Sequence, residues 1–253
     1  MPTSPLLRRR ARPVAGLLVL SLVLAACGSD DGDDTTTATD ETTTTVDGTT
    51  TSDGDGVGPG VAAEVNLQLA DLPEGWVAGP TAEDDDDDVL GECLGLDLDE
   101  IEERQVDEAD SPEFSNPEAL KQTVSSGTSI YDDEEVPAEI FDRLRAEETI
   151  PCLRAAFEER FTSDEELEGV DVRFEEIVFV DDFPTFGDES LLLTIAIVLS
   201  AESQEFSAHL DFVFLRTAEV ASFVYALNLG EPTDPGLVTD LADAVAARQA
   251  ASV

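Results

Sequence analysis

Four runs of strand-like sequence in the second half of the chain constrain its fold more than any other feature. The run LLLTIAIVL, residues 191–199, is apolar on both faces, as expected of a central strand that is covered on both sides or nearly so. Residues 206–214 instead alternate apolar and polar side chains, which predicts a half-buried strand. Together with residues 170–180 and 220–229, these runs are joined by short polar connections. We therefore expect consecutive strands to pair antiparallel as a meander.

Helical patterns precede and follow these strands. Pro137 begins one helical pattern, and Thr149-Ile150-Pro151 marks a break followed by a second helix start. Asp234-Pro235 predicts the start of a C-terminal helix, because an acid is a good N-cap and proline is favoured at the first helical position. The prediction is a single α+β domain over residues 61–253: a twisted antiparallel β-meander sheet with helices packed on one face.

The N-terminus has the three parts of an export signal. A basic segment precedes an apolar run at residues 14–23, and small residues then lead to Cys27. The apolar run is too short to span a membrane, since a bilayer core requires about 20 apolar residues. The stretch LAAC that ends at Cys27 resembles a bacterial lipobox, at which the signal is cut and the cysteine receives lipid chains. We expect residues 1–26 to be a lipoprotein signal peptide; an ordinary cleaved signal with a chance cysteine is the alternative.

The predicted location follows from this signal. Lipid on Cys27 would anchor the protein to the cell membrane on its extracytoplasmic side. Residues 27–60 are rich in Thr, Asp, Gly and Ser, with too few apolar side chains to offset the entropy of ordering, so they are expected to form a disordered stalk. The five consecutive aspartates at residues 84–88 are expected in a solvated loop, because like charges repel one another.

The acidic composition excludes some partners. The full chain carries a formal charge of −45 at pH 7. Nucleic acid binding requires lysine and arginine to neutralise phosphates, so nucleic acid is not expected as a partner. Anionic lipid headgroups would also be repelled, which leaves the lipid on Cys27 as the expected membrane contact.

The cysteine content fits export. With Cys27 used for lipid, Cys93 and Cys152 remain as a pair, and in an oxidising compartment we expect them to form a disulfide. Two separately buried thiols are the alternative. The spacing of the cysteines and the single histidine predict no metal site, because zinc requires clustered Cys or His ligands.

No catalytic motif is recognisable in the chain. His209 is the single histidine, and the alternation of its strand places it on the polar face, where a solvated histidine is the simplest interpretation. No G-x-S-x-G motif or phosphate-binding loop occurs, and with 58 acidic residues the proximity of two carboxylates carries no information. We therefore expect neither an enzyme nor a cofactor.

Aromatic residues are the candidates for binding a ligand. Four of them lie on one face of the predicted sheet, and the single tryptophan lies near the start of the domain; these candidates are Trp76, Phe212, Phe214, Phe223 and Tyr225. A packing role in the core is the alternative for each of them.

Several of these segments together resemble a known family. The stretches LADLPEGW, FGDES, HLDFVFLRTAEVASFVYALNLG and AVAARQA are similar to the PknH-like extracellular domain, a sensor-type domain of actinobacterial receptor kinases and stand-alone lipoproteins. The resemblance covers residues 65–250. Kinase-type members commonly hold two disulfides around a cleft between sheet and helices, whereas this chain can form one.

The resemblance implies a non-catalytic, sensor-like domain. Such a domain would bind a small amphiphilic ligand between sheet and helices. The alternative is a protein-interaction or scaffold module of the cell envelope, whose acidic loop at residues 83–92 would contact a cationic partner protein.

Overall fold

The computed structural model describes residues 60–81, 89–119, 121–163, 169–201 and 204–253. The predicted signal peptide, Cys27, nearly all of the stalk and the aspartates at residues 84–88 lie outside these residues. Within the described ranges, no helix has the length and apolar character needed to cross a membrane.

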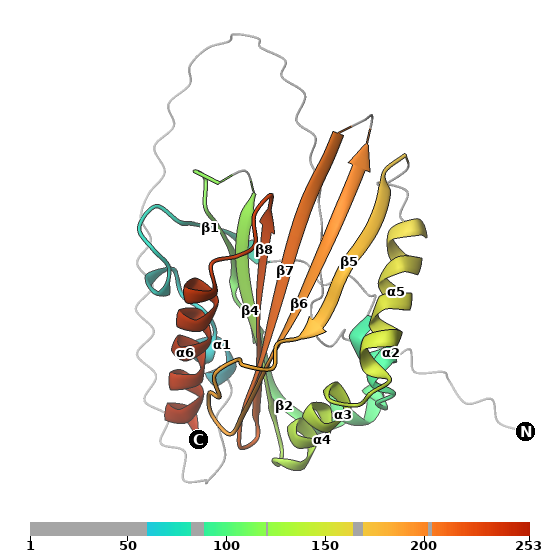
Figure 1. Ribbon diagram of the computed structural model, residues 1–253. Coiled ribbons are helices and arrows are strands. Elements are labelled where there is room, and N and C mark those ends of the chain that lie inside the picture. Colours follow the sequence, from blue (N-terminus) through green and yellow to red (C-terminus); the bar gives the residue numbers. More distant parts are fainter. Residues whose placement is uncertain (1–59, 82–88, 120, 164–168, 202–203) are drawn as a thin grey trace, which may run out of the picture.

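The domain is built on one antiparallel sheet, drawn in Figure 1. In the described residues the sheet has eight strands in the order β1-β3-β4-β8-β7-β6-β5, and β2 pairs with β4 beside this path. The strands are β1 (Val77–Thr81), β2 (Gln105–Asp110), β3 (Pro112–Ser115), β4 (Gln122–Tyr131), β5 (Asp171–Phe179), β6 (Glu189–Ala201), β7 (Gln204–Thr217) and β8 (Val220–Leu229). The α+β class and the predicted meander of the last four strands are confirmed.

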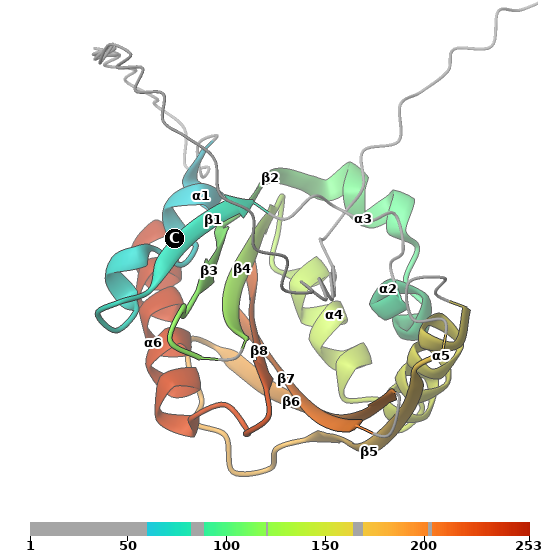
Figure 2. The same cartoon turned by 90° about the horizontal axis from the view of Figure 1, so that it is seen from above.

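Helices cover both faces of this sheet. Seen from above, the sheet is curved, with α1 (Val61–Val65) and α6 (Pro235–Ser252) outside the curve (Figure 2). Inside the curve lie α2 (Val89–Leu94), α3 (Leu98–Arg104), α4 (Glu135–Leu144) and α5 (Thr149–Ser163). We call the face that carries α1 and α6 the outer face of the sheet, and the face that carries α2 to α5 the inner face.

This arrangement differs from the prediction, which placed the helices on only one face of the sheet. The physical reason is in β7, where apolar side chains occupy successive positions rather than alternate ones. Val213 and Leu215 belong to the core beneath α6, while Phe212 and Phe214 belong to the core beneath α4 and α5. Both faces of the strand therefore require cover from water.

Local signals in the sequence act as predicted. Asp234 caps α6 by accepting a hydrogen bond from the Gly236 amide at 2.8 Å, and Pro235 is the first residue of the helix. In β5 the register shifts between Phe174 and Glu176, at two consecutive glutamates, which indicates a β-bulge. Helix α4 begins two residues before Pro137.

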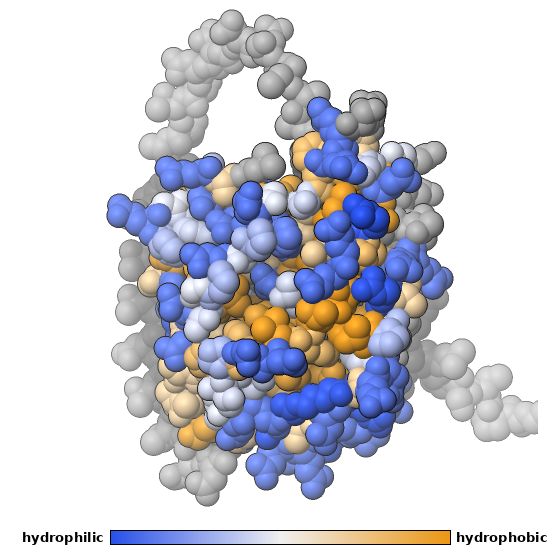
Figure 3. Space-filling view, viewed as in Figure 1, coloured by the Kyte–Doolittle hydropathy of each residue, from blue (hydrophilic) through white to orange (hydrophobic). Residues whose placement is uncertain are grey.

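The outer face is covered in one half and open in the other. Helix α6 packs against β7 and β8. Farther along the sheet, Val178 and Val180 are 38% and 37% exposed, and apolar surface gathers over this part of the molecule (Figure 3).

A buried polar network joins α6 to the sheet. Gln249 is fully buried and donates from Nε2 to the Ser222 hydroxyl at 2.9 Å. Its amide oxygen accepts from the Thr217 hydroxyl at 3.1 Å. The Ser222 hydroxyl also pairs with that of Thr128 at 2.8 Å, and Thr128 donates to Asn66 at 2.8 Å. One side chain of α6 thus bonds to a buried hydroxyl group on β8 and a partly buried one on β7.

Replacing Gln249 tests this network. Gln249→Leu should lower the free energy of unfolding by about 1–3 kcal/mol, because buried hydroxyl groups of the sheet lose their partner. Urea unfolding of the variant and the parent measures the difference. Gln204→Leu, at an exposed strand end, should change the free energy by less than about 0.5 kcal/mol. Equal effects of the two substitutions would contradict the role of Gln249 in this buried network.

Candidate functional site

The strand register assembles a row of side chains across the inner face. Asp110 on β2 lies opposite Gly127 on β4, and Gly127 lies opposite Phe223 on β8. Phe223 in turn lies opposite Phe214 on β7. Four strands therefore place a carboxylate, a glycine and two phenylalanines side by side.

Gly127 gives this row its shape. A Cβ atom at this position would lie 2.3 Å from Cε1 of Phe223 and 2.5 Å from Oδ1 of Asp110. Because glycine lacks that atom, the Phe223 ring and the Asp110 carboxylate both reach into the space that a side chain at residue 127 would fill. Any larger residue at position 127 must displace one of these two side chains.

An apolar cavity lies above this row. It has a volume of about 120 Å³ and opens to solvent. Phe214 and Phe223 form its floor, while the helical side contributes Leu94, Leu96, Ile101, Ile140 and Phe141. The cavity thus lies between the sheet and the helices, with α2 and α3 as its cover.

The cavity has one polar wall. Glu108 and Asp110 line it from β2, two residues apart on the same face of the strand. Tyr131 also lines it, and burial, reinforced by the negative charge of Glu108, raises the pKa of Tyr131 to about 12 despite a hydrogen bond with Ser129. The phenol is therefore neutral at physiological pH, and the carboxylates give this wall its charge.

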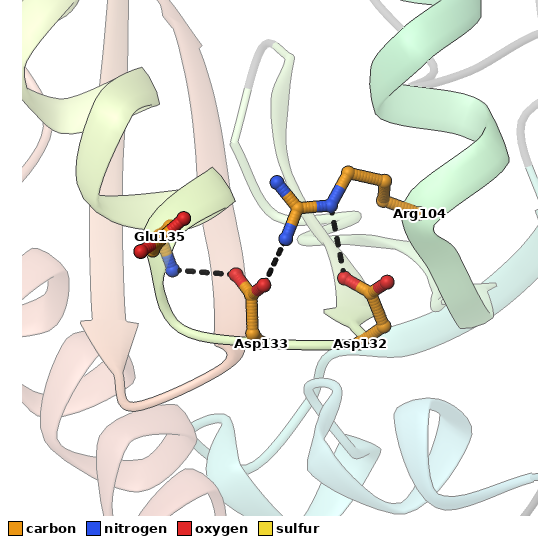
Figure 4. Close-up of polar contacts among 4 residues, drawn as sticks. All are labelled: Arg104, Asp132, Asp133 and Glu135. Atoms are coloured by element: carbon orange, nitrogen blue, oxygen red, sulfur yellow. Dashed lines mark hydrogen bonds and ion pairs between the residues drawn. The ribbon is translucent and has the colours of Figure 1, made fainter.

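Two attachments hold the cover in place. The structure contains the predicted disulfide between Cys93 and Cys152, which joins α2 to α5 across a sequence separation of 59 residues. At the end of α3, the Arg104 guanidinium donates to Asp132 at 3.0 Å and also to Asp133 (Figure 4). Asp133 accepts a further hydrogen bond from the Glu135 amide at 2.8 Å, at the start of α4.

Between these attachments the cover is thinly packed. Helix α3 has no buried residue. On its other side lies a polar cavity of about 190 Å³, lined by Glu100, Arg104 and Glu139 among others. A segment that is fixed at its two ends and loosely packed between them is suited to admit a ligand to the cavity below it.

The structure separates the five aromatic candidates. Phe214 and Phe223 line the cavity. Phe212 and Tyr225 lie in the neighbouring cross-strand row, with ring centroids 5.0 Å apart. Trp76 lies in the core of the outer face with α6.

Tyr225 has an unusual hydroxyl group. The ring is partly exposed, but the hydroxyl oxygen is buried and has no hydrogen-bond partner within the described residues. Burial raises the pKa of Tyr225 well above its usual value. The hydroxyl therefore stays protonated.

The polar side chains of His209 and Asp211 lie on the outer face of β7, since Leu210 and Phe212 belong to the core of the inner face. His209 is partly exposed, and the neighbouring acid on the same face, Asp211, accepts a hydrogen bond from Thr194 at 2.7 Å. Across the described ranges, no three His, Cys, Asp or Glu side chains are grouped so that they could hold a metal ion.

Sequence reasoning missed the cover and the acidic wall. Asp110 and Gly127 carry no motif, and their proximity to Phe223 follows from pairing between strands that are distant in the sequence. The signal that could have pointed to Gly127 is a glycine inside a strand pattern, which often marks the close approach of another group.

Comparison with known proteins includes a weak likeness to a solved structure. No protein-family model matches the chain, and no curated protein matches it. A solved structure, the extracellular domain of PknH from Mycobacterium tuberculosis, is similar with a TM-score of 0.42 and 10% sequence identity, and the match covers 75% of this chain and 95% of that one. The resemblance indicated by the sequence is thereby confirmed as a weak one, and it transfers no role to any residue of the cavity.

Proposed function

We propose that this chain is a membrane-anchored bacterial lipoprotein whose non-catalytic extracytoplasmic domain binds a small amphiphilic ligand. The ligand occupies the cavity between the inner face of the sheet and the cover formed by α2 and α3. One observation carries the proposal: an apolar cavity has an aromatic floor, Phe214 and Phe223, and a charged wall at one side. Pockets that bind small molecules typically combine an apolar lining with a few polar groups that orient the ligand.

Native mass spectrometry tests ligand binding directly. The mature chain from residue 27, with Cys27→Ser to prevent lipid attachment, is incubated with an actinobacterial envelope lipid extract. We expect a bound mass under native conditions that is lost on denaturation. A bare protein mass after this incubation would contradict the proposal and favour the alternative of a protein-interaction module.

Two phenylalanine variants locate the ligand. Phe223→Ala should raise the dissociation constant at least about tenfold, since the loss of an aromatic contact in a cavity costs about 1.4 kcal/mol or more. Phe206→Ala is the matched control, because Phe206 is 44% exposed and lies outside the cavity lining. If both variants bind like the parent, the ligand occupies another site.

Membrane attachment is tested at Cys27. Cys27→Ala in the full chain should move the protein from the membrane fraction to the soluble fraction, because a protein without its lipid chains loses its anchor. Fractionation of host cells followed by immunoblotting measures the change. Equal membrane association of the variant and the parent would contradict the lipoprotein assignment.

A further inference from the structure

The lining of the inner-face cavity is asymmetric in charge. Its helical side and floor are apolar, whereas β2 supplies the carboxylates of Glu108 and Asp110. Within the described part of the chain, no lysine or arginine lines the cavity. Arg104, at the end of the cover, lines the separate polar cavity and is paired with Asp132 and Asp133.

The position of Asp110 makes this charge relevant to a ligand. Its carboxylate and the Phe223 ring both occupy the space that a side chain at Gly127 would fill, so Asp110 lies beside the aromatic floor. Glu108 lies next to it along β2, nearer to solvent and opposite Ser129. A ligand resting on Phe223 therefore has its polar end within reach of one or two negative charges.

These charges discriminate between headgroups. A carboxylate, sulfate or phosphate head would lose hydration and meet like charges, and the lining residues that the structure describes include no lysine or arginine. An ammonium head would gain ion pairing with the carboxylates and attraction to the neighbouring aromatic rings. The whole chain, at −45, also concentrates cations near its surface.

We propose that the ligand of this cavity is a cationic amphiphile, an apolar chain or ring system that carries an amine or ammonium group. The apolar part lies on Phe214 and Phe223, and the cation lies against Asp110 and Glu108. This inference rests on the proposed function, since it specifies the chemical class bound at the same cavity.

Three probes with ten carbon atoms each test which headgroup the cavity prefers. Decylamine, 1-decanol and decanoate are titrated below micellar concentrations into the mature chain with Cys27→Ser, at about 0.15 M salt to screen exposed charges. We expect decylamine to bind at least about tenfold more tightly than decanol, and decanoate to bind most weakly of the three.

Variants that neutralise the two carboxylates of the wall test where the preference for decylamine arises. Glu108→Gln with Asp110→Asn should remove the advantage of decylamine over decanol. Glu231→Gln with Asp243→Asn is the control, since it removes the same charge at exposed positions outside the cavity lining and should keep the advantage.

The outcomes separate this inference from the proposed function. Equal binding of decylamine and decanol would overturn the cationic class and leave an apolar binding site. Loss of the preference in the control variant would also overturn it, because the preference would then arise from the general acidity of the surface. Binding of none of the probes, together with no ligand from the lipid extract, would overturn the proposed function itself.

Discussion

Removing the disulfide should lower the free energy of unfolding by about 4 kcal/mol. The variant carries Cys93→Ser and Cys152→Ser, and its parent is the mature chain with Cys27→Ser. The reason is that the bridge closes a loop between residues separated by 59 positions, so the unfolded chain gains conformational freedom when the bridge is absent. Urea unfolding measures the change.

A reducing agent supplies the control for this prediction. It should destabilise the parent by a similar amount and leave the serine variant unchanged. The serine variant should also bind the ligand more weakly, because α2 loses its covalent attachment to α5 and the cover of the cavity loosens. A stability within about 1 kcal/mol of the parent would show that the bridge constrains the unfolded chain less than its loop length predicts.

Gly127→Val should destabilise the domain by about 3 kcal/mol, at the upper end of the range for overpacked sites. A Cβ at residue 127 overlaps the Phe223 ring and the Asp110 carboxylate, and the added methyl groups increase the overlap. The ring must then leave the floor of the cavity, so ligand binding should fall together with stability. Urea unfolding and native mass spectrometry of the same variant measure both effects.

A double-mutant cycle identifies the cause of this effect. In a Phe223→Ala background the substitution Gly127→Val should cost much less, because the clashing ring is absent. A cost that is the same in both backgrounds would mean that the loss arises from the backbone of β4 rather than from the ring. The cycle thereby tests the close approach on which the shape of the cavity depends.

Much of the fold could be predicted from local patterns. The run at residues 191–199 and the strands on either side of it form the predicted meander, because period-two alternation and apolar runs report directly on burial. Asp234 and Pro235 begin α6 as expected, since capping acts within a few residues. Each of these signals lies within a single strand or helix, so it can be recognised without knowing which other segment packs against it.

Other elements were not predictable in this way. The sequence of β2, QVDEAD, contains three acids in six positions and has little strand propensity. It forms a strand because its backbone pairs with β4, and that pairing carries Glu108 and Asp110 to the cavity. Helices α2 and α3 are short, and their position over the inner face depends on Cys152 and on Asp132 and Asp133.

The sequence by itself determined the α+β class, the C-terminal meander and the common face of Phe212, Phe214, Phe223 and Tyr225. Alternation along a strand decides which side chains share a face, and this is a local property. Only the tertiary structure decided that Phe214 and Phe223 line a cavity, that Trp76 lies in the opposite core, and that Asp110 stands beside the Phe223 ring. The reason is that these relations depend on pairing and packing between segments far apart in the chain, for which no single segment carries a signal.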